Sequence, residues 1–254
     1  EIGGQQIDKH YSDWMFIWNE LSLPTGKRYG YNKMIGADSW SLSKLAETDS
    51  FKLYIPLEFW FCRNVGLALP LIALQYHEVK FRIEFAEKSE CAVNWAAETA
   101  ADEGDEAPTA AAVTIKDIKR VDIWVDYIYL DTDERRKFAQ LSHEYLIEQL
   151  QFGGEESYST QVRLNFNHPC KELVWVSKWP TAAAPATKNQ TVNWYNYSKT
   201  DAMRTSDSAA AALVDGGNPF VTAHIKLNGN DRIAPRDGTY FDVIHPYQHH
   251  TNVP

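Results

Sequence analysis

Two pairs of neighbouring side chains in this sequence could begin a zinc-binding helix of the H-E-x-x-H type. The pairs start at His77 and His143, and each histidine is followed directly by a glutamate. The position that should hold the second histidine is Phe81 in the first pair and Ile147 in the second. Because one ligand of the motif is absent from both pairs, we predict no metal site at either.

His249 and His250 are a further candidate for metal binding, because imidazole is a common ligand. Adjacent residues on an extended chain point to opposite faces, so the two rings could not easily hold one ion. The sequence therefore predicts a structural role for both histidines.

The tightest group of carboxylates is formed by Asp131, Asp133 and Glu134, a group that could serve a glycosidase or a metal cluster. Asp131 and Glu134 have the spacing of a capping box, and the first turn of a helix favours negative charge. We therefore predict a short helix from Thr132 to Leu141, which these carboxylates stabilise.

Two tripeptides, at Asn189 and Asn196, match the acceptor signal for N-glycosylation. They lie beside Trp194, Tyr195 and Tyr197, whose rings could stack on a sugar or contact a neighbouring subunit. A carbohydrate-binding or carbohydrate-cleaving protein is therefore an alternative that the sequence leaves open.

Composition and motifs exclude other classes of function. The 254 residues are 44% hydrophobic and 13% aromatic, enough for one large domain or two smaller ones. The formal net charge of -9 repels a phosphate backbone, so we predict no direct contact with nucleic acid. The motifs GxGxxG, GxxxxGKS/T and GxSxG are all absent, so the sequence predicts no cofactor and no catalytic residue.

Cysteine usage and hydropathy indicate the compartment. Cys62, Cys91 and Cys170 are odd in number and far apart, which predicts reduced thiols. The longest apolar stretch, residues 65–76, is too short to span a bilayer, so we predict no membrane insertion. The sequence starts at Glu1 without an initiator methionine, and we expect a piece of a longer chain.

Periodicity predicts one helix near the start and a series of strands after it. An apolar stripe with helical spacing runs from Ile7 to Leu21. The strand at residues 121–129 is apolar on both sides and is expected to be covered on both faces. The predicted strands span residues 51–61, 79–85, 121–129, 145–152, 162–166, 173–176 and 225–227, and short strands are expected to continue to the end.

Turns and loops separate these strands. Asn228-Gly229 is a strong signal for a hairpin turn. Residues 96–112 and 180–219 are rich in small and polar side chains and are predicted surface loops. The pattern favours an all-β protein of antiparallel sandwiches, such as jelly rolls, with a domain boundary near residue 143.

Five strings spread over nearly the whole chain resemble the major capsid protein of nucleocytoplasmic large DNA viruses, with the phycodnaviruses (Phycodnaviridae) as the nearest branch. They are EIGGQQIDKHYSDW (Glu1–Trp14), GLALPLIALQYHEVKF (Gly66–Phe81), WVDYIYLDTDERRKFAQLSHEYLIEQLQF (Trp124–Phe152), LNFNHPCKELVW (Leu164–Trp175) and LNGNDRIAPRDGTYFDVIHPYQHH (Leu227–His250).

The resemblance implies a double jelly roll, in which two jelly-roll β-sandwiches follow each other in the chain. Residues 1–142 would be the C-terminal part of the first jelly roll, and residues 143–254 the N-terminal part of the second. Each sandwich would then be truncated at one end and would carry short helices and long loops.

The resemblance further implies a structural protein and not an enzyme. Three subunits would form a homotrimer, a pseudo-hexagonal capsomer that builds an icosahedral virion shell and contacts neighbouring capsomers and minor capsid proteins. The protein would be located in the virion capsid after assembly in the host cell cytoplasm, with Asn189 and Asn196 as the candidate glycosylation sites.

Overall fold

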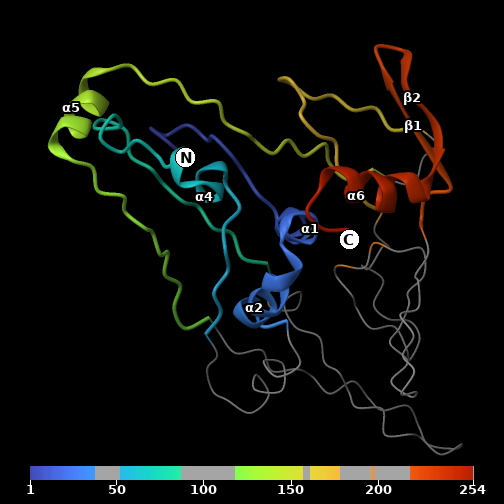
Figure 1. Ribbon diagram of the computed structural model, residues 1–254, viewed down its shortest axis with the longest axis horizontal. Helices are drawn as coiled ribbons and strands as arrows, with labels where there is room; N and C mark the ends of the chain where they lie inside the picture. The colour runs from blue at the N-terminus through green and yellow to red at the C-terminus, as the bar shows by residue number, and fades with distance from the viewer. Residues whose placement is uncertain are drawn as a thin grey trace, which may run out of the picture.

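The computed structural model describes residues 1–37, 52–86, 118–156, 161–177, 195, 197 and 218–253. Its N-terminal and central helices are α1 (Ser12–Ser22), α2 (Thr25–Ile35), α4 (Trp60–Arg63), the 3-10 turn η1 (Val65–Leu67) and α5 (Thr132–Gln140). A hairpin of β1 (Thr222–Leu227) and β2 (Asn230–Asp237) precedes the π-helical turn η3 (Tyr240–Ile244) and α6 (His245–His249). Figure 1 shows α1 in the middle, α5 and the hairpin on opposite sides, and long extended segments between them.

The helix expected over Ile7–Leu21 is present as α1, but it begins later. Tyr11 has extended backbone (φ -114°, ψ 158°), and Ser12 is the first helical residue. Ile7 and Tyr11 lie in an extended segment, where Asp8 accepts a hydrogen bond from a distant part of the chain. The apolar stripe therefore predicts the helix and its buried face but not its first turn.

A second helix, α2, forms where the sequence indicates only a polar connector. Pro24 precedes its first residue, a place that suits proline because its φ is fixed and it lacks an N–H. Gly36 ends the helix at φ 77°, which glycine adopts without strain. None of the α2 residues is buried, and the first half of the helix is polar or glycine apart from Tyr29, so apolar periodicity is a weak signal for it.

Two large apolar side chains are buried in the described residues, Leu21 of α1 (7% exposed) and Trp60 of α4 (9%). Trp14 and Trp18 of α1 stack with ring centroids 5.5 Å apart, and the Arg63 guanidinium of α4 lies 4.3 Å from the centroid of the Trp18 ring. A cation–π contact thus joins α4 to α1.

Helix α5 confirms the predicted helix to within one residue. Asp131 and Glu134 form a reciprocal capping box, in which the Glu134 carboxylate accepts the Asp131 N–H at 3.3 Å. At the other end, His143 Nε2 lies 2.8 Å from the Phe138 carbonyl oxygen, which has no helical partner, and the His143 ring stacks on Phe138. The carboxylates and His143 therefore stabilise the two ends of one helix.

The predicted Asn228-Gly229 hairpin is also confirmed. Both turn residues have positive φ, 52° for Asn228 and 81° for Gly229, as a two-residue type I′ turn requires. The two strands pair antiparallel with two irregularities of register. After β2, a Cβ on Gly238 would lie 1.9 Å from the Phe220 carbonyl oxygen, so this close approach requires glycine.

The other predicted strands are extended but form no regular ladder within the described ranges. Residues 1–3 and 78–80 come nearest to one, with an Ile2–Val79 bridge flanked by backbone hydrogen bonds of 2.7–3.0 Å. The strand predicted for 51–61 ends in α4, and the strand predicted for 121–129 is exposed on the faces that were expected to be covered. The backbone groups of a strand need hydrogen-bond partners on a neighbouring strand. Within the described ranges, few of the predicted strands have such a neighbour.

The strands expected after the hairpin are replaced by the helical turns η3 and α6. Pro246 lies just after the change from the π-helical turn η3 to α6, and the helical backbone continues through it. The all-β expectation is thus wrong for this segment and for α2, whereas helices were predicted at the places of α1 and α5. It holds, within the described ranges, for the hairpin and in part for the extended segments.

Some sequence predictions concern residues outside the described ranges. They are the loop at 96–112, most of the loop at 180–219, Cys91, Trp194, Asn189 and Asn196. Of the remaining cysteines, Cys62 and Cys170 are free and exposed. None of the helices in the described ranges has the length and apolar character to cross a membrane.

Replacing Leu21 with alanine should destabilise α1. Loss of a buried leucine side chain costs about 2–5 kcal/mol, so hydrogen exchange should show lower amide protection in this helix. Leu146→Ala is the matched control, because Leu146 is 95% exposed, and it should change this protection by less than about 0.5 kcal/mol. Equal losses in the two variants would contradict the stabilising role of the buried Leu21 side chain.

Candidate functional site

The carboxylate of Asp8 ties the N-terminal segment to the segment after α5. Its Oδ1 accepts hydrogen bonds from the Leu150 N–H at 3.1 Å and the Lys9 N–H at 2.9 Å. Beside it, the Gln149 side chain donates to the Ile7 carbonyl. These bonds join residues 142 positions apart, so they connect parts of the chain that lie on either side of α5.

His10 completes the surroundings of Asp8. Its Nε2 lies 2.9 Å from Asp8 Oδ2, and the two side chains are only 7% and 10% exposed. The His10 ring stacks on Phe59, just before α4, with centroids 4.4 Å apart. His10 Nδ1 is buried without a hydrogen-bond partner, so the ring is held by its contacts with Asp8 and Phe59.

Glu148 joins three further parts of the chain. Its carboxylate accepts hydrogen bonds from Lys171 and from Arg63 of α4, and Arg63 lies over the Trp18 ring of α1. The hydrogen bond from Lys171 lowers the pKa of Glu148, and the charges of Lys171 and Arg63 lower it further, against the effect of burial. A series of contacts from α1 to residue 171 therefore depends on a charged carboxylate at position 148.

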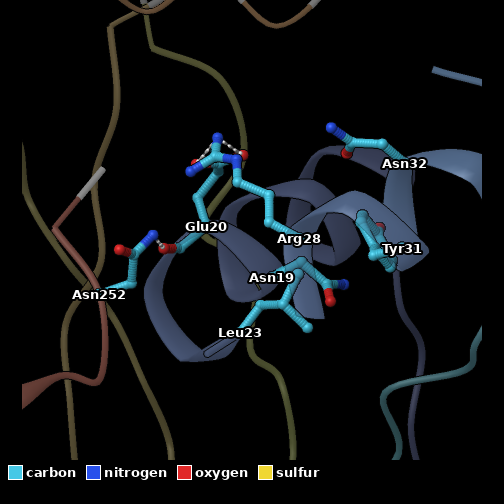
Figure 2. A pocket seen from close by; sticks show the side chains of 7 residues that line it. All are labelled: Asn19, Glu20, Leu23, Arg28, Tyr31, Asn32 and Asn252. Atoms are coloured by element: carbon cyan, nitrogen blue, oxygen red, sulfur yellow. Dashed lines mark hydrogen bonds and ion pairs between the residues drawn. The ribbon is translucent and has the colours of Figure 1, made fainter. Parts of the chain in front are cut away.

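Asn252 holds the C-terminal part of the described chain against α1. Its backbone N–H donates to the Leu21 carbonyl at 3.0 Å, and its side chain donates to the Glu20 carbonyl at 2.9 Å. Carbonyls in the last turn of a helix lack helical partners, so these bonds also cap α1. Figure 2 shows Asn252 beside Glu20, whose carboxylate binds Arg28 of α2 with both oxygens at 2.7 Å.

The pocket between these side chains is small. Its volume is about 10 Å³, which has room for one water molecule and none for an organic ligand. Tyr31 of α2 lines it, and burial, followed by the charge of Glu58, raises the pKa of Tyr31 to about 12. The pocket is therefore a polar contact between α1, α2 and residue 252 rather than a binding site (Figure 2).

Two tyrosines of the second predicted loop pack on α1. Tyr195 stacks on Phe16 with centroids 4.3 Å apart and an angle of 10° between the rings. The Tyr197 hydroxyl donates to Asp13 Oδ1 at 3.1 Å, and burial, with the nearby Asp13 carboxylate, raises the pKa of Tyr197. These contacts favour packing within the chain over the alternative that the two rings stack on a sugar.

Exposed apolar side chains lie along the extended segment before α5. We call this segment, residues 118–130, the apolar segment. Trp124 is 85% exposed and Tyr129 is 91% exposed. Figure 1 shows the apolar segment reaching α5 on one side, while the segment after α5 leaves in another direction. Its exposed apolar side chains are Ile118, Val121, Ile123, Trp124, Val125, Tyr127, Ile128 and Tyr129. Exposed apolar side chains are thus concentrated in this segment.

The residues considered as metal ligands are not brought together. His249 ends α6 with its ring 4.4 Å from that of His245, whereas His250 Nε2 lies 2.7 Å from Glu172 Oε1. The two adjacent rings have different partners because α6 ends between them. The prediction had assumed an extended chain at both residues. No group of three or more His, Cys, Asp or Glu side chains in the described ranges is placed to hold a metal ion.

Sequence reasoning missed the polar side chains that join distant segments. For Asp8 a signal exists, because Asp8 and His10 share one face of an extended segment, and an acid and a histidine so placed can pair. Glu148 and Asn252 carry no such signal. Their partners lie 85 and 232 positions away, beyond the reach of any local pattern.

Two family models match the chain. One, described as "Major capsid protein N-terminus", matches residues 1–131, and the other, described as "Large eukaryotic DNA virus major capsid protein", matches residues 134–254. The two matches meet at the start of α5. The domain boundary predicted from the sequence, near residue 143, lies just beyond that helix and stays a prediction.

Curated relatives of the chain are named major capsid proteins. The chain is 44% identical over 256 residues to that of Pyramimonas orientalis virus, with 100% of the chain and 52% of the relative covered. It is 36% identical over 349 residues to that of Phaeocystis pouchetii virus (100% and 66% covered) and 41% identical over 270 residues to that of Paramecium bursaria Chlorella virus 1 (98% and 56%). The chain therefore spans about half to two thirds of the length of these relatives.

Two solved structures are similar to the chain. One is a crystal structure of PBCV-1 VP54 fitted into a cryo-EM reconstruction of the virophage Sputnik, with a TM-score of 0.60 at 35% identity over 100% of this chain and 60% of the other. The second is a quasi-atomic model of the PBCV-1 virus capsid, with a TM-score of 0.53 at 32% identity over 98% and 59%.

The variant Asp8→Ala should release the N-terminal segment from Leu150. Loss of a buried acceptor leaves donors without a partner, at a cost of about 1–3 kcal/mol. The amide of Leu150 should then exchange with solvent roughly 5- to 150-fold faster, as hydrogen exchange would measure. Asp126→Ala, at an exposed aspartate of the apolar segment, is the control and should leave this amide unchanged. Unchanged exchange in Asp8→Ala would refute the role of Asp8.

Acidification should break the contacts of Glu148. Because its pKa is lowered in the folded chain, the stabilisation is fully present above the ordinary pKa of 4.5 and is lost as the pH falls through the folded value. Thermal unfolding at a series of pH values from 6 to 3 should show this loss, and Glu148→Gln should remove that part of the pH dependence. Glu144→Gln, an exposed glutamate of the same segment, should keep it.

Proposed function

The chain belongs to the major capsid protein family of large eukaryotic DNA viruses, and we propose that it is a structural subunit of an icosahedral virion shell. In this proposal three copies form a homotrimer, a pseudo-hexagonal capsomer. Each capsomer contacts neighbouring capsomers and minor capsid proteins. The similarity of the whole chain to proteins named major capsid proteins, and to a structure of a virus capsid, supports this role.

The fold proposed for the complete subunit is the double jelly roll. Residues 1–142 would contribute to the first sandwich and residues 143–254 to the second. The likeness to the VP54 structure, with a TM-score of 0.60, supports this assignment. The long extended segments on both sides of α5 also support it, because extended backbone is what the strands of a sandwich require (Figure 1).

Association of subunits would be driven by the apolar segment. Side chains on both of its faces are exposed, and Trp124 and Tyr129 are large aromatic residues of the kind that dominate protein interfaces. Covering such a surface stabilises an assembly in proportion to the apolar area removed from water. The exposure of this segment is the observation that carries the proposed mechanism.

No catalytic step belongs to this proposal. The relatives are structural capsid proteins, and neither family model describes an enzyme. We propose a protein of the virion capsid that is assembled in the host cell cytoplasm, without a cofactor, without membrane insertion and without direct contact with nucleic acid. Asn189 and Asn196 remain the candidate sites for glycans on its surface.

A charge within the apolar segment should weaken assembly. Trp124→Asp and Tyr129→Asp each place a carboxylate in the proposed contact, and an interface residue of this kind contributes about 2 kcal/mol or more. The association constant of the subunits should then fall roughly thirtyfold or more. Analytical ultracentrifugation would measure the trimer, and electron microscopy would show whether capsomers and shells form.

The matched controls are Trp124→Phe and Tyr129→Phe, which keep an apolar ring at each position. They should assemble as the unaltered protein does, within about threefold. Shells of normal yield from both aspartate variants would refute the apolar segment as the contact. A protein that stays monomeric without any substitution would refute the proposed function itself.

A further inference from the structure

An open groove of about 410 Å³ lies where the N-terminal segment meets the two segments that follow α5. Small-molecule sites in proteins have volumes of about 300–1,000 Å³, so the groove has the size of such a site. Its walls come from three non-helical stretches of the chain, residues 6–9, 149–152 and 165–168. We call it the amide groove, after the side chains that dominate its lining.

The lining of the amide groove is rich in carboxamides, each of which can both donate and accept hydrogen bonds. The exposed side chains of Gln6 and Asn165 have no hydrogen-bond partner among the described residues. Their donors and acceptors are therefore available to a bound molecule. The carboxamide residues of the lining are Gln6, Gln149, Gln151, Asn165 and Asn167.

Hydrogen bonds between the three stretches hold the walls of the groove in place. The Leu150 N–H donates to Asp8 Oδ1 at 3.1 Å, which joins the first stretch to the second. The Asn167 N–H donates to the side-chain oxygen of Gln151 at 2.9 Å, which joins the second to the third. The groove is thus formed before a ligand binds, and this lowers the cost of ordering on binding.

Two phenylalanine rings add apolar surface among the amides. Phe152 is 58% exposed, and its ring contacts that of Tyr11 with centroids 5.0 Å apart. Phe166 is half-buried, and its ring lies 3.6 Å from the place that a Cβ on Gly153 would take. Rings that are supported in this way can pack against an apolar face of a ligand.

The charged groups of the lining do not select an ion. The Asp8 carboxylate is matched by His10 and by backbone N–H groups, and Lys9 Nζ lies 5.1 Å from the centroid of the Tyr11 ring. His168 is the remaining ionisable residue of the lining. In the part of the chain that the structure describes, no group of three or more His, Cys, Asp or Glu could hold a metal. The lining therefore suits a neutral, polar ligand.

We propose that the amide groove binds a neutral saccharide. The hydroxyl groups of a sugar donate and accept hydrogen bonds as carboxamides do, and its C–H face packs on an aromatic ring. Gln6 and Asn165 bind the hydroxyl groups, and Phe152 packs against the sugar ring. The groove lies within one chain, so this proposal does not depend on the role of the chain in a virion shell.

Titration calorimetry of the full chain with neutral oligosaccharides of glucose, mannose or galactose tests the proposal. At least one of these probes should bind. Asn165→Ala and Gln6→Ala should each weaken the binding about threefold to tenfold, because each removes a hydrogen bond to the sugar. Phe152→Leu should weaken it by a similar factor, because it keeps an apolar side chain but removes the ring.

The matched controls are Gln140→Ala and Phe85→Leu, which alter an exposed amide and an exposed ring outside the groove. Both should bind the probe as the unaltered chain does. Asn165→Ala and Gln6→Ala remove no hydrogen bond within the described residues, so hydrogen exchange should show an unchanged fold in both.

Binding of none of the probes would overturn the proposal, and this is the result expected if the groove instead holds an extended segment of another chain through backbone hydrogen bonds. Equal affinity of the unaltered chain and of all three groove variants would overturn it as well. So would a loss of binding in the controls that is as large as the loss in the groove variants.

The source of the saccharide can be distinguished with glycosylated protein, before and after enzymatic removal of its glycans. Tighter binding of the probe after removal would assign the groove to a glycan carried by the protein itself. Equal binding before and after removal would assign it to a saccharide from outside the protein.

Discussion

Two carboxylates, those of Asp8 and Glu148, join described parts of this chain that lie on either side of α5 in the sequence. Asp8 binds the backbone at Leu150, and Glu148 binds Arg63 and Lys171, so both act on the same short stretch after α5. Loss of a nearly buried acceptor such as Asp8 leaves its donors unpaired and is costly, whereas solvent screens the exposed ion pairs of Glu148. The extended segments have no ladder of their own in the described ranges, and they depend on these side chains for their places.

Many large apolar side chains of the described residues are exposed, Trp124 and Tyr129 among them. Polar contacts and a few ring contacts join the segments that lie far apart in the sequence. In a self-sufficient domain the apolar groups would supply most of the stability by facing inward. A subunit that completes its apolar contacts only in an assembly has the opposite arrangement, as the proposed function requires.

Local signals in the sequence predict local structure well. The capping box at Asp131 and Glu134 gives α5 to within one residue, and Asn228-Gly229 gives the hairpin, because both depend on the backbone preferences of a few neighbouring residues. Most of the predicted strands have no regular ladder in the described ranges, for a different reason. Alternation shows which residues suit a strand, but a ladder also needs a partner, and no local pattern specifies that partner. The resemblance to a known family is what supplied the function.

The bonds from Asn252 to the end of α1 bear on when this chain can acquire its structure. Glu20 and Asn252 are 232 positions apart, so a ribosome that adds about 5–20 residues per second needs roughly 10–50 seconds to make the second partner after the first. During that interval Asn252 cannot cap the C-terminal end of α1, and in its earlier part the N-terminal segment has no Leu150 to bind. The nascent chain therefore cannot form these two contacts until residues 150 and 252 have been made, so the bonds that join its distant segments form late.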